Sequence, residues 1–374
     1  MNSEDMAGIR RHLESPGVSL GEYVRRRQME LADELVPRQA VYLDQKFWII
    51  LRDVVAGART ATDEVELLEL LRERVGSGRA FCPISESSFA ELFKQRDTRT
   101  REATARLIDE LSLGVSLIPF DERVVLEMES FILSEGGRKD LVPLHRLMWS
   151  KLSYILGQVH PARTGFDAAT ELALQKAFFD HMWTISLSEM VRIIGASMPP
   201  DGDAFHTLAK RLNAGNAQHA DELRSFNQTY GIELRGGLDL VAPLAADIVG
   251  EIAERATGRS MLRDGDEWND LVRQWHAFLA EAFKKDEVKD ALRTLHINTS
   301  LHAAVRWNKA QRFEANDFHD FHHAAAALGY CDVFLTERGL KSMVTASHIA
   351  LDTRYGCRVA ADVREGISAL RERA

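Results

Sequence analysis

The stretch ANDFHDFHHAAAALGYCDVFLTERGL, from Ala315 to Leu340, predicts a helix, a tight stop and a buried strand. Asn316 or Asp317 can begin the helix, because a short polar side chain accepts hydrogen bonds from the unpaired amides of the first turn. The Ala-rich run favours helix, and Gly329 suits the left-handed position that often ends one. The apolar run DVFLT is long enough for one buried strand. Helix and strand would run antiparallel, so the helix start and the strand end would meet.

Two acids lie at the ends that this antiparallel course brings together. Asp320 lies near the start of the helix and Glu337 at the end of the strand. Asp332 opens the strand, which places it roughly 15 Å away at about 3.3 Å per residue. We therefore expect Asp320 and Glu337 to be neighbours, with Asp332 as the weaker substitute for Glu337.

Strands and helices alternate in the chain before residue 136. Helical patterns separate three runs typical of short strands, which are the start of AVYLDQKFWIIL, RAFCPIS and GVSLIPFD (residues 40–51, 79–85 and 114–121). This alternation is typical of an α/β fold with a parallel sheet flanked by helices.

The alternation stops over residues 136–312, where long amphipathic helical patterns carry no convincing strand signal. Strand-like runs return at residues 332–336 and 357–360. We therefore expect an N-terminal helical segment at 1–36, a first part of the α/β domain at 37–135, a large all-helical insertion at 136–312, and the second part of the domain at 313–374.

Composition limits the class of protein. The 374 residues are 45% hydrophobic, enough for a proper core, and no apolar run reaches the roughly 20 residues of a membrane helix. The three cysteines have no C-x-x-C spacing, which argues against a zinc site or a disulfide framework and predicts a cytoplasmic protein. The net charge of −9 argues against attraction of nucleic acid by the whole surface and leaves room for a local basic patch.

Four acids are expected at one edge of the sheet. Sites in open parallel sheets form where the strands end. Asp44 ends the first strand, Glu91 lies one turn into the helix after the second, Asp320 opens a helix, and Glu337 ends a later strand. Crowded carboxylates repel one another and normally need a divalent cation, and hard oxygen ligands select Mg²⁺ or Mn²⁺. Such a site can hydrolyse phosphodiesters.

Three segments, YLDQKFWIIL, CPISESSFAELF and DFHHAAAALGYCDVFLTE, follow in the order of the motifs of the PIN-like nuclease family, which the chain resembles over roughly half its length. The resemblance implies a parallel α/β/α sandwich and a Mg²⁺- or Mn²⁺-dependent endonuclease acting on single-stranded or structured RNA, with DNA as the alternative. Asp44, Glu91 and Asp320 stand at the family's acidic positions. A homo-oligomer or an inhibitory protein partner is left open.

Two departures from the family pattern leave a second interpretation open. Lys46 stands where the family usually has Asn, and Arg338 stands at the usual position of the fourth acid, one residue after Glu337. A PIN-like scaffold without catalysis, binding nucleic acid or protein, would account for both. Asp44 could equally be a helix cap, and Glu91 a solvated helix acid.

A third interpretation is an HD-type metal phosphohydrolase. His319 and Asp320 form an HD doublet, two histidines follow at 322 and 323, and His160 and His181 could supply further ligands. That fold is all-helical, so the strand-like runs would go unexplained.

A basic segment follows Glu91. Its cations Lys94, Arg96, Arg99 and Arg101 could bind phosphates on either side of a scissile bond, or form a solvated helix face. The run RWNKAQR at residues 306–312 is a second, weaker candidate for the same role.

Overall fold

The computed structural model describes residues 3–195, 204–218 and 225–372. Its centre is a four-stranded parallel sheet in the order β2 (Ala80–Phe81), β1 (Gln39–Leu43), β5 (Val333–Leu335) and β6 (Arg358–Ala360). β1 and β5 are neighbours in register, with Leu43 opposite Leu335. The expected α/β fold with a parallel sheet is therefore confirmed, and strands distant in sequence end side by side.

Helices make up most of the rest of the chain. In chain order they span Ser3–Leu13 (α1), Leu20–Leu35 (α2), Gln45–Val55 (α3), Thr62–Gly76 (α4), Glu86–Lys94 (α5), Thr98–Ser112 (α6), Phe120–Glu135 (α7), Ala168–Met182 (α8), Leu187–Ile194 (α9), Ala204–Gln218 (α10), Phe226–Thr257 (α11), Asp266–Ala282 (α12), Asp286–Ala291 (α13), Arg293–Trp307 (α14), Asp317–Tyr330 (α15), Arg338–Val344 (α16), Leu351–Tyr355 (α17) and Val363–Arg371 (α18), with short 3₁₀ turns at Leu144–Arg146 and Leu152–Tyr154.

The two faces of the sheet bury different helices. Successive side chains of a strand point to opposite faces. Tyr42 and Phe334 accordingly belong to a core shared with α2, α14 and α15. Val41 and Leu43 belong to a second core shared with α3, α4, α6 and α18. Every residue of β1 and β5 is buried, which explains their nearly continuous apolar sequence.

One expected strand has a different partner. β3 (Val115–Leu117) pairs antiparallel with β4 (Trp149–Lys151) in a separate two-stranded sheet, and an isolated parallel bridge joins Ser116 to Ile84, three residues after β2. β4 lies inside residues 136–312, so the expectation of an all-helical insertion is wrong at this point. Ser150 and Lys151 make two of its three residues polar, so no apolar run revealed it.

The end of α15 also differs from the expectation. The helix continues through Gly329 to Tyr330, and Gly329 is not among the residues with positive φ. Arg293 and Ile297 approach this position from α14, with side-chain atoms 3.6–3.8 Å from where a β-carbon would lie. A β-carbon would meet these atoms in ordinary van der Waals contact, so Gly329 is an interior residue of the helix at its contact with α14 and does not end it.

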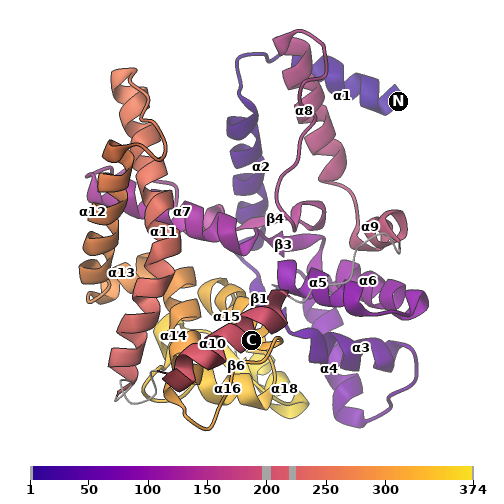
Figure 1. Cartoon of the computed structure of the whole chain (residues 1–374). Helices are drawn as coiled ribbons and strands as arrows, with labels where there is room; N and C mark the ends of the chain where they lie inside the picture. Colours follow the sequence, from indigo (N-terminus) through magenta and orange to yellow (C-terminus); the bar gives the residue numbers. More distant parts are fainter. Residues whose placement is uncertain (1–2, 196–203, 219–224, 373–374) are drawn as a thin grey trace.

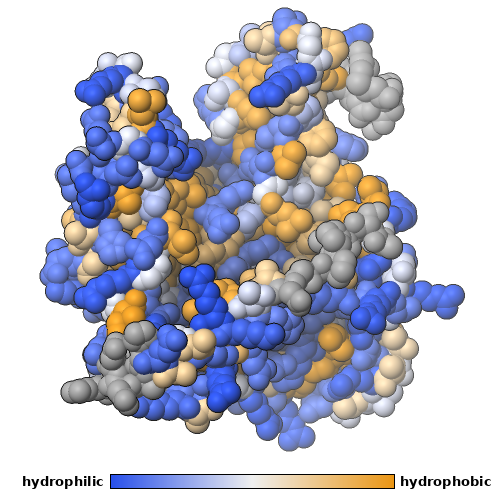
Figure 2. Space-filling model, in the orientation of Figure 1, coloured by the Kyte–Doolittle hydropathy of each residue, from blue (hydrophilic) through white to orange (hydrophobic). Residues whose placement is uncertain are grey.

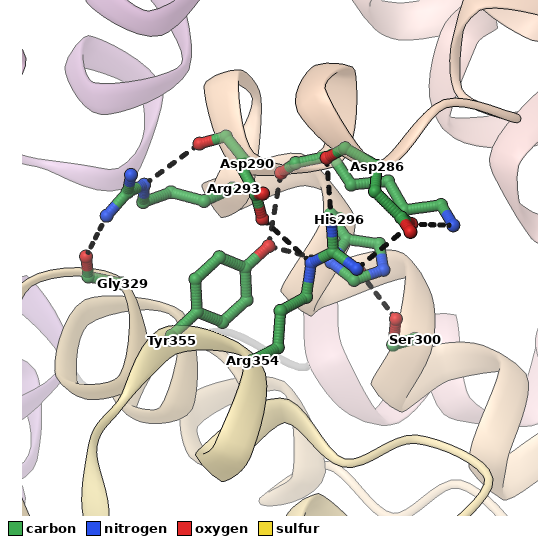
Figure 3. Close-up of polar contacts among 9 residues, drawn as sticks. Asp286, Asp290, Arg293, His296, Ser300, Gly329, Arg354 and Tyr355 are labelled. Atoms are coloured by element: carbon green, nitrogen blue, oxygen red, sulfur yellow. Dashed lines mark hydrogen bonds and ion pairs between the residues drawn. The ribbon is translucent and has the colours of Figure 1, made fainter.

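Side-chain contacts between residues far apart in the sequence join helices α13 and α14 to α17, near the C-terminus. Arg354 of α17 bonds to Asp286 and Asp290 of α13, and the ring of His296 lies 2.8 Å from the Tyr355 hydroxyl (Figure 3). Two helical pairs, α11 with α12 on one side and α8 with α1 on the other, extend away from the sheet (Figure 1). Figure 2 shows the surface hollowed between them.

None of the helices that the structure describes is both long enough and apolar enough to span a bilayer.

Candidate metal centre

The pairing of β1 with β5 sets Asp44 beside Thr336. The Asp44 amide donates to the Leu335 carbonyl (3.0 Å), and the Asp44 side chain is hydrogen-bonded to Thr336. Asp44 also begins α3, where its carboxylate accepts from the Phe47 amide at 3.3 Å. Asp44 can therefore cap α3 and bind a metal at the same time, because only one of its carboxylate oxygens accepts the hydrogen bond from the helix. Glu337 follows Thr336 and is exposed at the start of α16.

Two helices bring the other acids to the same region. Asp320 lies in the first turn of α15 and is contacted by the Asn316 amide nitrogen at 3.4 Å. Glu91 lies on α5, which packs against α15. The link between them is His323, one turn after Asp320, whose Nε2 is 3.0 Å from Glu91 Oε2.

His323 is the centre of a buried polar network. Its Nδ1 lies 2.7 Å from the Tyr42 hydroxyl, which in turn lies 2.6 Å from Ser85 Oγ and 3.2 Å from Ser88 Oγ. With both ring nitrogens protonated, His323 donates to Glu91 and to Tyr42, and Tyr42 donates to Ser85. The network therefore holds Glu91 in a defined orientation and favours the charged imidazolium.

The carboxylates influence one another electrostatically. Burial raises the pKa of Asp44 to about 6, and the charge of Glu337 adds to the rise. Burial raises the pKa of Asp320 to about 7, and the charges of Glu91 and Asp44 add to it. Each acid is thus close enough to another member of the cluster to feel its charge. These pairwise influences place Asp44, Glu91, Asp320 and Glu337 in one electrostatic neighbourhood, and their joint role as metal ligands stays a prediction.

His323 neutralises part of this negative charge. Burial lowers its pKa, but the hydrogen bond and charge of Glu91, with the charges of Asp44 and Asp320, outweigh burial and leave it raised. For Glu91 the balance is reversed: burial raises its pKa, and the hydrogen bond and charge of His323 leave it lowered. The cluster still holds more carboxylates than cations, so a further cation would stabilise it.

The donor chemistry fits Mg²⁺ or Mn²⁺, since Asp44, Glu91, Asp320 and Glu337 offer the hard oxygen ligands those ions prefer. Among the residues that the structure describes, no three His, Cys, Asp or Glu side chains form a ready coordination group. A magnesium site needs no such cage, because Mg²⁺ usually keeps several waters and binds one or two carboxylates together with substrate phosphates.

Asp332, Lys46 and Arg338 are the other charged positions that the sequence singled out. Asp332 accepts from the Ala40 amide at 2.9 Å, at the opposite end of β5, as the distance argument predicted. Lys46 donates to the Ala361 carbonyl, directly after β6, at 3.0 Å. Arg338 is exposed in the first turn of α16.

The histidines of the HD-type alternative do not form one site. His319 is buried and lies 2.8 Å from Lys94 Nζ, close enough to Glu91 for its charge to lower that acid's pKa. His322 stacks on Phe120 with ring centroids 4.4 Å apart. His160 packs beside Tyr154 and Phe179, and His181 is exposed on α8. The parallel sheet also disagrees with the all-helical fold that this alternative requires.

The basic segment divides into two classes. Lys94, Arg96 and Arg99 are exposed. Arg101 is buried, donates to the Gln95 and Gly195 carbonyls at 3.3 Å, and lies over the Phe93 ring. Arg101 is therefore a packing residue, and its predicted phosphate contact is wrong.

Sequence reasoning missed the role of His323 and Tyr42. The signal for His323 was present, because a residue three positions after Asp320 lies on the same face of a helix. Tyr42 lies on β1, two residues before Asp44, but only the fold shows that its hydroxyl contacts Ser85, Ser88 and His323.

Comparison with protein-family models, with curated proteins and with solved structures found no match for this chain.

Proposed function

We propose that the chain is a metal-dependent endonuclease of the PIN-like type that hydrolyses phosphodiester bonds, with RNA as the preferred substrate. The observation that supports this most directly is the electrostatic influence of Glu337 on Asp44, and of Glu91 and Asp44 on Asp320, together with the raised pKa values of Asp44 and Asp320. Burial of charged carboxylates, with a smaller addition from their neighbours' charge, costs stability unless a ligand neutralises them, which is the property expected of a cation site.

Asp44 and Asp320 would hold the cation, with Glu91 and Glu337 beside them. When bound, Mg²⁺ or Mn²⁺ would activate water and stabilise the leaving oxygen. Thr336 orients Asp44, and His323 orients Glu91 through the hydrogen bond described above. The buried, unpaired cysteines Cys82, Cys331 and Cys357 suit the reducing cytoplasm that we propose for the protein.

The second candidate function is binding of nucleic acid or protein without cleavage. It is favoured by Lys46, which stands where the family usually has Asn and is engaged with the Ala361 carbonyl, and by Arg338 in place of the fourth acid. The same experiment separates the two functions.

The test is cleavage of labelled single-stranded RNA and DNA with Mn²⁺ by the parent, Asp44→Asn and Asp332→Asn. Asp44→Asn should lower the rate by about two to three orders of magnitude, since a bound metal supplies several kcal/mol of transition-state stabilisation. Asp332→Asn is the matched control, because the amide oxygen can still accept from Ala40 at the far end of the same strand. A parent without metal-dependent cleavage would favour the second candidate, and equal rates for parent and Asp44→Asn would refute the site.

A further inference from the structure

A hollow of about 640 Å³ lies between α10 and the chain leading into α15. Its apolar wall includes Phe205 and Phe313. Asn213 ties the two sides together: its side-chain nitrogen donates to the Phe313 carbonyl at 2.9 Å, and its oxygen accepts from the Phe313 amide at 2.8 Å. This paired contact fixes the shape of the hollow. In Figure 1, α10 crosses in front of the domain beside α15.

The hollow adjoins the carboxylate cluster. Lys94, Asn316 and His319 line it. His319 precedes Asp320 in sequence, and the Asn316 amide reaches the Asp320 carboxylate at 3.4 Å. A molecule whose reacting group lay at the acids could therefore extend into this hollow.

A second hollow, of about 410 Å³, continues from the first and shares Asn213 with it. The residues lining the two hollows include five Lys or Arg side chains and a single acid, Glu314. The five are Lys94, Lys210, Arg306, Lys309 and Arg312. Together they form a basic track in a chain of net charge −9.

Three of these cations are available to a ligand. Lys210, Lys309 and Arg312 are exposed, and no carboxylate of the described residues lies within ion-pair distance of them. Arg306 differs, because it is paired with Glu233. The available charges therefore lie on both sides of Asn213, where a chain of phosphates could pass from one hollow to the next.

The first hollow has the chemistry of a nucleobase site. Phe205 is half-buried, stacks on Phe318 with centroids 5.3 Å apart, and meets the His319 ring edge-on at 5.0 Å. Aromatic side chains beside a basic groove are how proteins bind unpaired nucleotides, because every base offers a face for stacking. A duplex would keep its bases within the stack, away from Phe205.

We infer that the hollow between α10 and residues 313–319 holds an unpaired nucleotide beside the scissile phosphate, and that Lys210, Lys309 and Arg312 bind the phosphates of the adjoining single strand. This inference rests on the proposed nuclease function for the position of the scissile phosphate. It names single-stranded nucleic acid as the substrate class and assigns its path to α10.

The test is fluorescence anisotropy of labelled oligouridylate and oligodeoxythymidylate in EDTA, which prevents cleavage. Replacing Lys309 and Arg312 together by Ala should weaken binding about tenfold and flatten the salt dependence by roughly 0.7 of a slope unit for each lost phosphate contact. Phe205→Leu should weaken binding about tenfold at an unchanged salt slope, through lost stacking. Circular dichroism melts would verify that each variant folds.

Two neighbouring residues of α10 give the matched comparison. Lys210 lines the first hollow, whereas Arg211, equally exposed, lines neither. Lys210→Ala should weaken binding several-fold and Arg211→Ala should leave it unchanged. Equal losses for the two, parental affinity in the Lys309 and Arg312 double variant, or equal affinity for a duplex competitor would each overturn the inference.

Cleavage with Mn²⁺, measured on the same variants, separates this inference from the nuclease proposal. A parent that binds through these residues and never cleaves would overturn the nuclease and support the nucleotide hollow. A parent that cleaves, with Lys309 and Arg312 variants that bind as the parent does, would overturn the hollow and leave the nuclease standing.

Discussion

The substitution Asp320→Asn should stabilise the metal-free protein, and more at high pH than at low pH. The pKa of Asp320 rises from its ordinary value of 3.8 to about 7, chiefly through burial and then through the charges of Glu91 and Asp44. Because the folded-state pKa is raised, the folded protein binds more protons than the unfolded chain between about pH 4 and pH 7. The free energy of unfolding must therefore fall as pH rises through that window.

The magnitude follows from the shift. At 1.36 kcal/mol per pKa unit, a rise of about 3 units corresponds to about 4 kcal/mol at pH 8, where folded Asp320 is charged. At pH 5 folded Asp320 is protonated, and only about 2 kcal/mol of this cost is present. The difference of about 2 kcal/mol is an upper limit, since Asp320 is partly exposed, and we expect roughly 1 to 2 kcal/mol.

The assay is urea denaturation in EDTA at pH 5 and pH 8 for the parent, Asp320→Asn and Glu69→Gln. Glu69 is an exposed carboxylate on α4 and controls for the general loss of one charge. The gain in unfolding free energy from Asp320→Asn should be larger at pH 8 than at pH 5, whereas Glu69→Gln should have a small effect at both. A gain of equal size at the two pH values, or a loss at pH 8, would refute the electrostatic account of the cluster.

Two further substitutions test the buried polar groups. His323→Gln should lower the free energy of unfolding by about 2 kcal/mol, the contribution of a hydrogen bond to a charged group. The pKa of His323 is raised in the folded protein, so its stabilising contribution is fully present below the unfolded-state pKa near 6.5. That contribution is lost as the pH rises through the folded-state pKa. A pH-independent difference between parent and variant in urea denaturation would contradict this. Glu127→Ala should cost about 3 kcal/mol in thermal or urea unfolding, since its buried carboxylate accepts from the Thr294 amide and hydroxyl and from the Tyr330 hydroxyl. Glu135→Ala, at the exposed end of the same helix, is its control, and equal costs for the two would remove the role given to Glu127.

The sequence predicted the sheet best where burial was most complete. β1 and β5 are buried along their whole length, and polar residues follow each of them, so the sequence indicated both the strands and the edge at which Asp44 and Glu337 lie. The sequence did not predict β4, because a three-residue strand with two polar side chains has neither an apolar run nor a full alternation of apolar and polar residues. Only its pairing with β3 makes it a strand.

Side-chain partners across long sequence distances could not be predicted. Arg101 lies within a run of charges that is normally solvated, and only the fold brings the Gly195 carbonyl to it. The hollow beside α10 likewise depends on Asn213 meeting Phe313. The basic run at residues 306–312 was visible as a weak candidate, but nothing local to it indicated the helix that would face it.

The carboxylate cluster sets the balance between stability and ligand binding in this fold. The raised pKa values of Asp320 and Asp44 correspond to about 4 and about 3 kcal/mol, which is large beside the 5–15 kcal/mol of a typical domain. Burial is the larger cause of both shifts, and the charges of neighbouring carboxylates add to it. His323 offsets part of the negative charge, but it is fixed between Glu91 and Tyr42 and supplies one charge at most. A cation that neutralises these acids would recover part of that energy as binding affinity. The acids that weaken the metal-free protein are therefore those expected to bind the metal most strongly.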